Sequence, residues 1–351
     1  MLNKHPPKKK FIDEKKMSKP SIILSGFADE CANEKTMDQQ FSAFAALGMR
    51  YFSIRFIDAG KGIKNVMSLE DDELETVKQK IAEYGLSVSS LGSPIGKAKL
   101  CDVDDGTKNS FKPFDQYLSE DVARACELTN AFGAKLIRGF SFYHPKGTPV
   151  EEHLAQATDQ VGKIAEVCES HGLTYGLEVE ANLVGQNGEL LGKMHEQIKH
   201  DALVLIFDGG NLVTMGYSAD EVYEQYEFMK PGLGWLHIKD FLNPKSGIVD
   251  HVDEEALKHF VPADIGDSGH AKIFADLVGF LPELESRMTA RGVPGVFLDL
   301  EPHVKGGGQF GGFSGPDGFG VALRALCRVC DDAGIGYKLR EFSDIQQDRG
   351  F

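Results

Sequence analysis

The sequence of 351 residues predicts an α/β fold, a single-domain (β/α)8 TIM barrel. Three observations support this prediction: eight short apolar runs have the character of buried strands, helical patterns separate nearly all of them, and a glycine marks five helix-to-strand junctions. Alternating helices and strands are typical of a parallel sheet, and eight such units close into a barrel. A doubly wound open sheet is the alternative, but the segment GFADE at 26–30 lacks the GxGxxG pattern expected after its first strand.

The strand candidates recur throughout the chain. They are expected at 21–24, 51–56, 87–91, 135–140, 174–180, 203–207, 234–238 and 294–301. Helices are expected at about 33–47, 68–84, 119–132, 150–170, 188–198, 218–229, 271–290 and 317–333. The junction glycines are Gly48, Gly85, Gly133, Gly172 and Gly292. Glycine accepts the left-handed conformation that ends a helix, so these positions predict the boundary between each helix and the next strand.

The barrel domain is expected to span residues 20–345. Residues 1–19 are polar and rich in lysine, which predicts a disordered or loosely attached extension. They lack the apolar core of a secretory signal, and the chain has no apolar run long enough to cross a membrane.

The composition is that of an acidic globular protein. With 38 Lys and Arg against 53 Asp and Glu, the formal net charge is −15, which disfavours nucleic acid or an anionic membrane as a partner. The six cysteines are scattered, as expected for a cytoplasmic protein in a reducing compartment. Cys327 and Cys330 fall in a helical pattern and are expected to pack in it rather than bind zinc. Apolar outer helices would permit a homodimer.

Ionisable residues gather at the predicted strand ends, where barrel enzymes place their chemistry. Glu180, Asp208, His237 and Glu301 come from the last four strands. Three carboxylates and one imidazole suit a divalent metal ion such as Mn²⁺, Mg²⁺, Co²⁺ or Zn²⁺. Glu178 lies on the same strand face as Glu180, because side chains alternate, and either could be the ligand. We prefer Glu180 because it lies nearer the rim.

These strand ends carry motifs that resemble a known family. The motifs are LEVEAN at 177–182, FDGGN at 207–211 with MGY at 215–217, LHIKD at 236–240, VPADIGD at 261–267 and LDLEP at 298–302. Over residues 21–340 the chain resembles the sugar phosphate isomerase/epimerase family of xylose-isomerase-like TIM barrels, in the superfamily of AP endonuclease family 2. The resemblance implies a metal held by a Glu, an Asp, a His and a second Glu, here Glu180, Asp208, His237 and Glu301.

Two departures from the family pattern stand out. Asn211 occupies a position that is often histidine in relatives, so a second histidine contact is not expected. The nuclease branch also uses histidines on the second and third strands, but this chain has none between His5 and His144. A three-metal phosphodiesterase centre like that of endonuclease IV is therefore not expected.

The predicted function is a divalent-metal-dependent isomerase or epimerase that acts on a keto or aldo sugar, a sugar phosphate or a related polyol. By resemblance to epimerising relatives, Glu180 and Glu301 are the predicted acid/base pair. Lys239 would polarise a substrate oxygen, although a salt bridge to Asp240 or Glu301 would also explain it. The predicted substrate-binding residues are Arg55, Arg138, Glu178, Asn211, Asp240, His303 and Lys305. The glycine-rich segment 305–315 could cradle an anion or close over a neutral sugar.

Three other functions fit the sequence less well. The same barrel and metal could serve a dehydratase or lyase acting on a keto-sugar or inosose. A non-catalytic sugar-binding barrel and an endonuclease IV-like phosphodiesterase are further alternatives.

Overall fold

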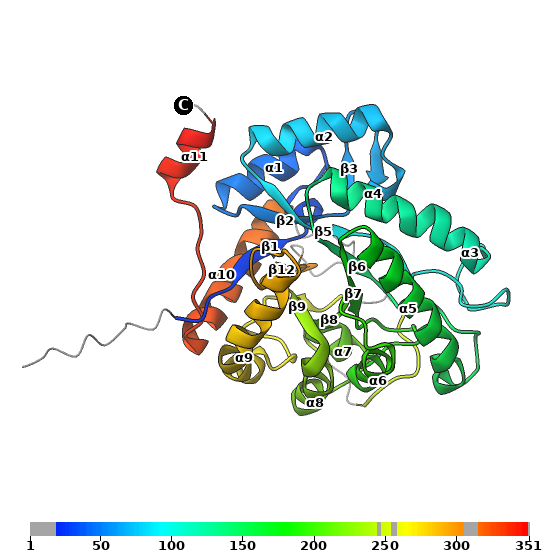
Figure 1. Ribbon diagram of the computed structural model, residues 1–351. Coiled ribbons are helices and arrows are strands. Elements are labelled where there is room, and N and C mark those ends of the chain that lie inside the picture. Colours follow the sequence, from blue (N-terminus) through cyan, green and yellow to red (C-terminus); the bar gives the residue numbers. More distant parts are fainter. Residues whose placement is uncertain (1–18, 244–246, 254–257, 305–314, 350–351) are drawn as a thin grey trace, which may run out of the picture.

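The computed structural model describes residues 19–243, 247–253, 258–304 and 315–349. Eight parallel strands surround the centre of the molecule and helices cover them from outside (Figure 1). The strands are β1 (Ile23–Gly26), β2 (Tyr51–Ile54), β5 (Ser87–Gly92), β6 (Leu136–Gly139), β7 (Thr174–Glu178), β8 (Leu203–Asp208), β9 (Leu233–Ile238) and β12 (Phe297–Leu300). All eight strand predictions are confirmed, and the protein is a single-domain TIM barrel.

The strands pair in the order β1-β12-β9-β8-β7-β6-β5-β2, and every neighbouring pair is parallel. A parallel bridge between Phe27 and Ser53, just after β1 and within β2, joins the two ends of the sheet. The sheet is therefore a nearly closed barrel, and the carboxyl ends of all eight strands open onto one face.

The eight predicted helices are present. They are α1 (Met37–Ala46), α2 (Asp71–Glu83), α4 (Ala123–Ala131), α5 (Leu154–Ser170), α6 (Gly188–Ile198), α8 (Ala219–Met229), α9 (His270–Ala290) and α10 (Gly315–Ala333). The predicted helix at 119–132 is longer, because α3 (Phe114–Tyr117) and a π-helical turn (Leu118–Val122) run directly into α4. Two further helices were not predicted, α7 (Gly209–Thr214) and α11 (Phe342–Arg349).

Two small antiparallel strand pairs lie at the carboxyl-end face of the barrel. One pairs β3 (Phe56–Asp58) with β4 (Ile63–Asn65) after the second barrel strand, and the other pairs β10 (Asp240–Phe241) with β11 (Phe260–Val261) after the seventh. The five junction glycines all have positive φ, between 62° and 78°, as the helix-ending role predicts. Of the predicted extension at 1–19, only Lys19 is among the described residues.

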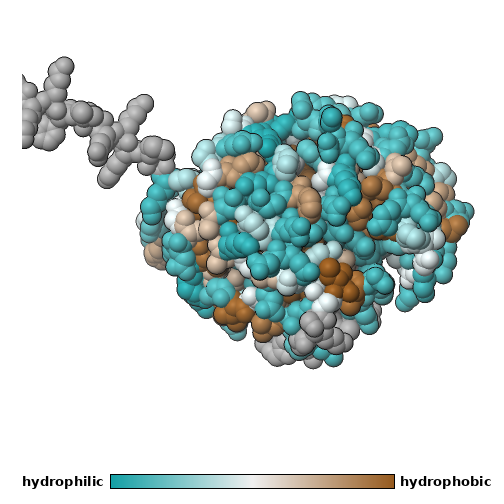
Figure 2. Space-filling view, turned by 90° about the horizontal axis from the view of Figure 1, so that it is seen from below, coloured by the Kyte–Doolittle hydropathy of each residue, from teal (hydrophilic) through white to brown (hydrophobic). Residues whose placement is uncertain are grey.

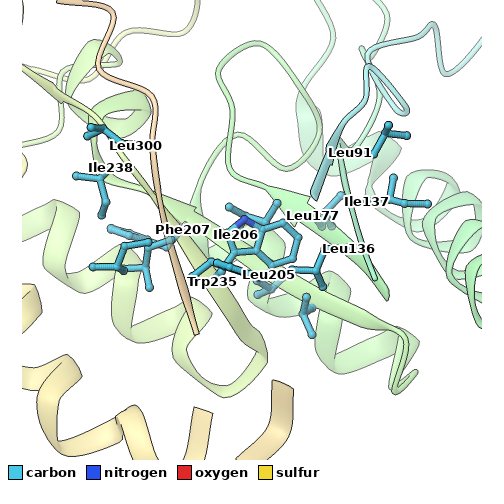
Figure 3. Packing of buried hydrophobic residues seen from close by; sticks show 14 of the residues in the cluster. Leu91, Leu136, Ile137, Leu177, Leu205, Ile206, Phe207, Trp235, Ile238 and Leu300 are labelled. Atoms are coloured by element: carbon cyan, nitrogen blue, oxygen red, sulfur yellow. The ribbon is translucent and has the colours of Figure 1, made fainter. Parts of the chain in front are cut away.

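An apolar layer fills the lower part of the barrel. The ring of Trp235 lies beside Ile206 in the middle of this layer (Figure 3). Gly176 on β7 makes room for it, since a Cβ atom at this position would lie 2.1 Å from the indole ring of Trp235. This packed layer forms a floor under the polar residues that the strands carry above it.

The remaining sequence predictions concern the cysteines and the surface. All six cysteines are free, and Cys330 is buried in the core from α10 while Cys327 is half-buried on the same helix. Among the described helices none is long and apolar enough to cross a bilayer. On the face shown in Figure 2, hydrophobic residues form small separate groups among hydrophilic ones.

Candidate metal centre and active site

Four buried side chains converge at the carboxyl ends of neighbouring strands. Glu178 ends β7, Asp208 ends β8, His237 lies near the end of β9, and Glu301 follows β12. One ligand atom of each lies within 4.8 Å of the corresponding atoms of the other three. The strands β12, β9, β8 and β7 are consecutive in the barrel, so Glu178 and Glu301 stand at the two ends of this arc with Asp208 and His237 between them.

The structure places Glu178 in this cluster, not Glu180 as the sequence argument preferred. Glu178 Oε1 lies 3.0 Å from Nδ1 of His237. Glu180 lies beyond the end of β7, on the wall of a cleft above the cluster, where its Oε2 accepts a hydrogen bond of 2.9 Å from Lys97 Nζ. The strand ends two residues earlier than the apolar pattern suggested, so the residue nearer the rim is too far out to reach the other three.

The FDGGN motif turns Asp208 toward the cluster. Asp208 Oδ1 caps helix α7 by accepting the backbone N–H of Asn211 at 3.1 Å, which leaves Oδ2 facing the interior. Gly210 permits this tight turn, because a Cβ atom there would lie 2.6 Å from Cγ of Lys239. The side chain of Asn211 donates to the carbonyl of Val179 at 2.9 Å, and it also lies 3.4 Å from Glu178. Asn211 therefore anchors the segment just after β7.

Lys239 lies inside the cluster. Its Nζ atom is 3.1 Å from Asp208 Oδ2 and 3.3 Å from Glu301 Oε2, so of the two predicted salt-bridge partners it meets Glu301. Burial alone would lower the pKa of Lys239, but these carboxylates raise it well above its ordinary value, and the side chain is an ammonium ion.

Asp240, predicted to bind substrate, points away from the cleft. Its Oδ1 accepts hydrogen bonds from the hydroxyl and backbone N–H of Ser268, and its Oδ2 lies 3.1 Å from Nδ1 of His270 at the start of α9. A Cβ atom at Gly266 would lie 2.2 Å from this carboxylate. Asp240 thus holds the connection between β10 and α9, and the prediction of a substrate contact is not supported by its position.

Two arginines contact the cluster from outside the four-strand arc: Arg138 lies on β6, beside β7, and Arg55 follows β2. Arg55 pairs with Asp29 and Glu30, each at 3.1 Å, and with Glu301. Arg138 lies 3.4 Å from Glu178 and 4.0 Å from Glu301.

The ring of Phe27, just after β1, is a site residue that the sequence analysis missed. The guanidinium carbons of Arg55 and Arg138 lie 4.4 and 5.1 Å from its centroid, and the ring of His237 meets it edge-on at 5.3 Å. Cations are attracted to an aromatic face, so Phe27 helps to hold both guanidinium groups in place. The only signal in the sequence was its place between the first apolar run and the acidic pair Asp29 and Glu30.

His303 lies at the mouth of the cleft with an uncommon backbone conformation, φ 49°. Its Nδ1 is 3.0 Å from Glu30 Oε1, and its ring meets Phe260 edge-on at 4.9 Å. Lys305 and residues 306–314 of the glycine-rich segment predicted to cradle an anion or close over a sugar lie outside the described residues.

The charges set the protonation of the cluster. Burial would raise the pKa of Glu178, but His237 and Arg138 lower it to about 2. Burial would also raise the pKa of Glu301, but Lys239 and Arg55 hold this pKa well below its usual range. Burial dominates at Asp208, where it raises the pKa to about 6 although Lys239 acts against it. Glu178 and Glu301 are therefore carboxylates at neutral pH, with His237 and Lys239 as their neighbours.

Above the cluster is a cleft of about 260 Å³. Its lining contains seven residues of the predicted site, namely Arg55, Arg138, Glu180, Asn211, Lys239, Glu301 and His303. Aromatic side chains from Phe56, Phe140 and Phe260 also line it. A cleft with several polar groups and aromatic walls is the common form of a small-molecule site.

The four-residue cluster fits a divalent cation by its donors. Three carboxylate groups and one imidazole supply the oxygen and nitrogen ligands that Mn²⁺, Mg²⁺, Co²⁺ and Zn²⁺ accept. A second group, formed by Glu30, Glu301 and His303, also has its ligand atoms within 4.8 Å. The first cluster is the better metal site, because it offers four ligand residues against three and all four are buried.

Comparison with known proteins agrees with this architecture. A protein described as a xylose isomerase-like TIM barrel from Mycobacterium smegmatis, in complex with magnesium, superposes with a TM-score of 0.58 at 18% identity, covering 90% of this chain and 97% of its own. The IOLI protein with a bound zinc atom gives a TM-score of 0.59 at 13% identity over 89% and 99% of the two chains. D-allulose 3-epimerase from Methylomonas sp. in complex with D-allulose gives 0.54 at 14% identity, also over 89% and 99%.

These identities show a shared fold. No curated protein matches the sequence. The family model described as xylose isomerase-like TIM barrel matches residues 41–328, which include all four residues of the cluster. The chain therefore belongs to the xylose isomerase-like TIM barrel family.

Proposed function

We propose that this protein is a divalent-metal-dependent isomerase or epimerase that acts on a keto or aldo sugar, a sugar phosphate or a related polyol. The observation that carries the proposal is the buried cluster of Glu178, Asp208, His237 and Glu301 at the bottom of a polar cleft. Structural neighbours include an epimerase solved with its sugar and barrels solved with magnesium or zinc, which supports this choice.

A divalent cation bound by these four residues would hold neighbouring oxygens of the substrate and stabilise the charge left when a proton leaves the carbon beside the carbonyl. Glu178 and Glu301 are the proposed acid/base groups. They stand at opposite ends of the four-strand arc, and their lowered pKa values keep both of them deprotonated before the substrate arrives, so that either can accept the proton that leaves the carbon. Epimerisation needs a group on each face of the carbon, whereas isomerisation can use one.

The other cleft residues orient the substrate. The ammonium of Lys239 lies beside Glu301 and would polarise a substrate oxygen. Arg55, Arg138 and His303 supply hydrogen-bond donors at the sides of the cleft, and Arg suits planar, two-point contacts. The predicted acid/base role of Glu180 passes to Glu178, and Glu180 with Lys97 becomes a wall contact for the substrate. The predicted cytoplasmic location and homodimer stay predictions.

Deuterium exchange tests the proposal. We expect the Mn²⁺-loaded protein in D₂O to incorporate deuterium beside the carbonyl of at least one member of a panel of ketoses, ketose phosphates and inositol-like ketones. Glu178→Gln and Glu301→Gln should each lose this exchange, and Glu180→Gln should keep bound metal and part of the exchange. Metal binding without exchange on any substrate would contradict the proposal. Loss of water or carbon–carbon cleavage among the products would instead establish the dehydratase or lyase alternative.

A further inference from the structure

A layer of buried hydroxyl groups lies under the cluster, inside the barrel. Ser25 on β1 and Ser89 on β5 have their Oγ atoms 2.7 Å apart, and Ser53 on β2 lies 2.6 Å from Ser90 on β5. Ser53 donates a hydrogen bond to Oδ2 of Asp299, on β12. All of these residues are buried. The buried carboxylate of Asp299 has lost its hydration, and a buried charge is stable only when it is paired as well as hydrogen-bonded. We therefore expect Asp299 to have a partner besides the hydroxyl groups.

That partner is the ring of His237. Asp299 and His237 are opposite each other in the pairing of β12 with β9. Oδ2 of Asp299 lies 3.7 Å from Nε2 of His237, and this nitrogen has no hydrogen-bond partner among the described residues. The distance is too long for a direct hydrogen bond, but a small rotation of either side chain or one bridging water would complete the contact.

The two ring nitrogens of His237 face different surroundings. Nδ1 points into the cluster, 3.0 Å from Glu178 Oε1 and 3.8 Å from Glu301 Oε2, whereas Nε2 points down toward Asp299. A neutral imidazole has its proton on one nitrogen and its lone pair on the other, and the hydrogen bond made by one nitrogen decides which. Without metal, Nδ1 donates to the Glu178 carboxylate. When a divalent cation takes the place of that proton, an acceptor below the ring keeps the remaining proton on Nε2 and leaves the lone pair of Nδ1 for the metal.

We propose that Asp299, held by Ser53, is a positioning residue that fixes the proton of His237 on Nε2 and presents Nδ1 to the divalent cation. This inference rests on the proposed function, because it concerns the same metal. It assigns a role to a carboxylate that the cluster itself does not use. A carboxylate behind a histidine ligand orients the ring and raises its basicity, and its loss commonly weakens metal binding by about 10- to 100-fold.

Calorimetric titration of the full-length protein with Mn²⁺ tests this role. We expect Asp299→Leu to weaken binding by about 10- to 100-fold, and Asp299→Asn, whose amide oxygen still accepts a hydrogen bond, to weaken it less. Ser53→Ala should fall between wild type and Asp299→Leu, and it keeps the test valid if the leucine variant does not fold. Ser90→Ala is the matched control, because Ser90 contacts Ser53 and not Asp299, and it should bind Mn²⁺ like the wild type.

A second measurement reports the ring directly. In the Zn²⁺-loaded wild type, the carbon and nitrogen chemical shifts of His237 should show metal on Nδ1 and the proton on Nε2, and Asp299→Leu should lose this signature. Wild-type Mn²⁺ affinity in both Asp299→Leu and Ser53→Ala, or a proton on Nδ1 in the Zn²⁺-loaded wild type, would overturn the inference. A wild-type protein that binds no divalent cation would instead overturn the proposed function.

Discussion

Replacing Lys239 by methionine should destabilise the protein without metal and tighten its binding of metal. The ammonium lies 3.1 and 3.3 Å from two buried carboxylates, and at an effective dielectric constant of about 20 each contact is worth about 5 kcal/mol before the cost of burial. Removing one partner of a buried ion pair costs about 3–5 kcal/mol in net terms. Asp208 can take up a proton in the variant, which places the expected loss at the lower end of this range.

A divalent cation in the cluster would replace the charge that the variant lost and would no longer be repelled by the ammonium. We therefore expect Lys239→Met to bind Mn²⁺ at least about tenfold more tightly, a gain of about 1.4 kcal/mol. Urea unfolding with a chelator and with Mn²⁺ gives the stability, and calorimetric titration gives the affinity.

The matched control is Lys97→Met. Lys97 pairs with Glu180 at the wall of the cleft and is more exposed, so its loss should cost about 1 kcal/mol or less and leave Mn²⁺ affinity unchanged. Equal or weaker Mn²⁺ binding in Lys239→Met, with the fold intact, would refute the view that this lysine and the metal compete for the same carboxylates.

Three further predictions concern packing, pH and the turn after β8. Gly176→Ala should lower the free energy of unfolding by about 1–3 kcal/mol or more, because its methyl group would overlap the ring of Trp235; a wild-type urea midpoint would contradict the packing of the floor. Mn²⁺ affinity should rise with pH through about 6 and continue to rise above it, because two ligands must lose a proton to bind metal: Asp208, whose pKa is raised to about 6, and His237, whose pKa is raised by Glu178 against the effect of burial; affinity that does not change between pH 5 and 7 would argue against both as ligands. Gly210→Ala should weaken Mn²⁺ binding, because its Cβ atom would push Lys239 and the Asp208 turn apart, whereas Gly279→Ala, at an exposed glycine of α9 with open space around it, should leave Mn²⁺ binding unchanged.

Much of the fold could be predicted because each unit of the chain repeats the same physical pattern. Apolar runs such as LVLIF at 203–207 can only be buried, and the glycine after a helix end, as at Gly172, marks where the chain reverses. Helix α7 was not predicted because it is six residues long and depends on a cap from Asp208. Periodicity has too few residues there to give a signal.

The sequence predicted which strands carry the site, but it did not predict which glutamate of β7 belongs to the cluster. Acidic strand ends indicated which strands meet, and the sequence pattern alone could not show that β7 ends at Glu178. The two glutamates share one face of the strand, so only the depth of each one in the barrel separates them. The contacts of Phe27 and the pairing of Arg55 with Asp29 and Glu30 join residues far apart in the chain, and no local pattern reports such contacts.

The most direct measurement is the metal content and Mn²⁺ affinity of two single variants, Glu178→Gln and Glu180→Gln, whose positions are two residues apart in the chain. We expect one tightly bound divalent cation per chain in the wild type and in Glu180→Gln. We expect severe loss of binding in Glu178→Gln, because the carboxylate of Glu178 belongs to the buried cluster. Full binding in Glu178→Gln together with loss in Glu180→Gln would contradict this expectation.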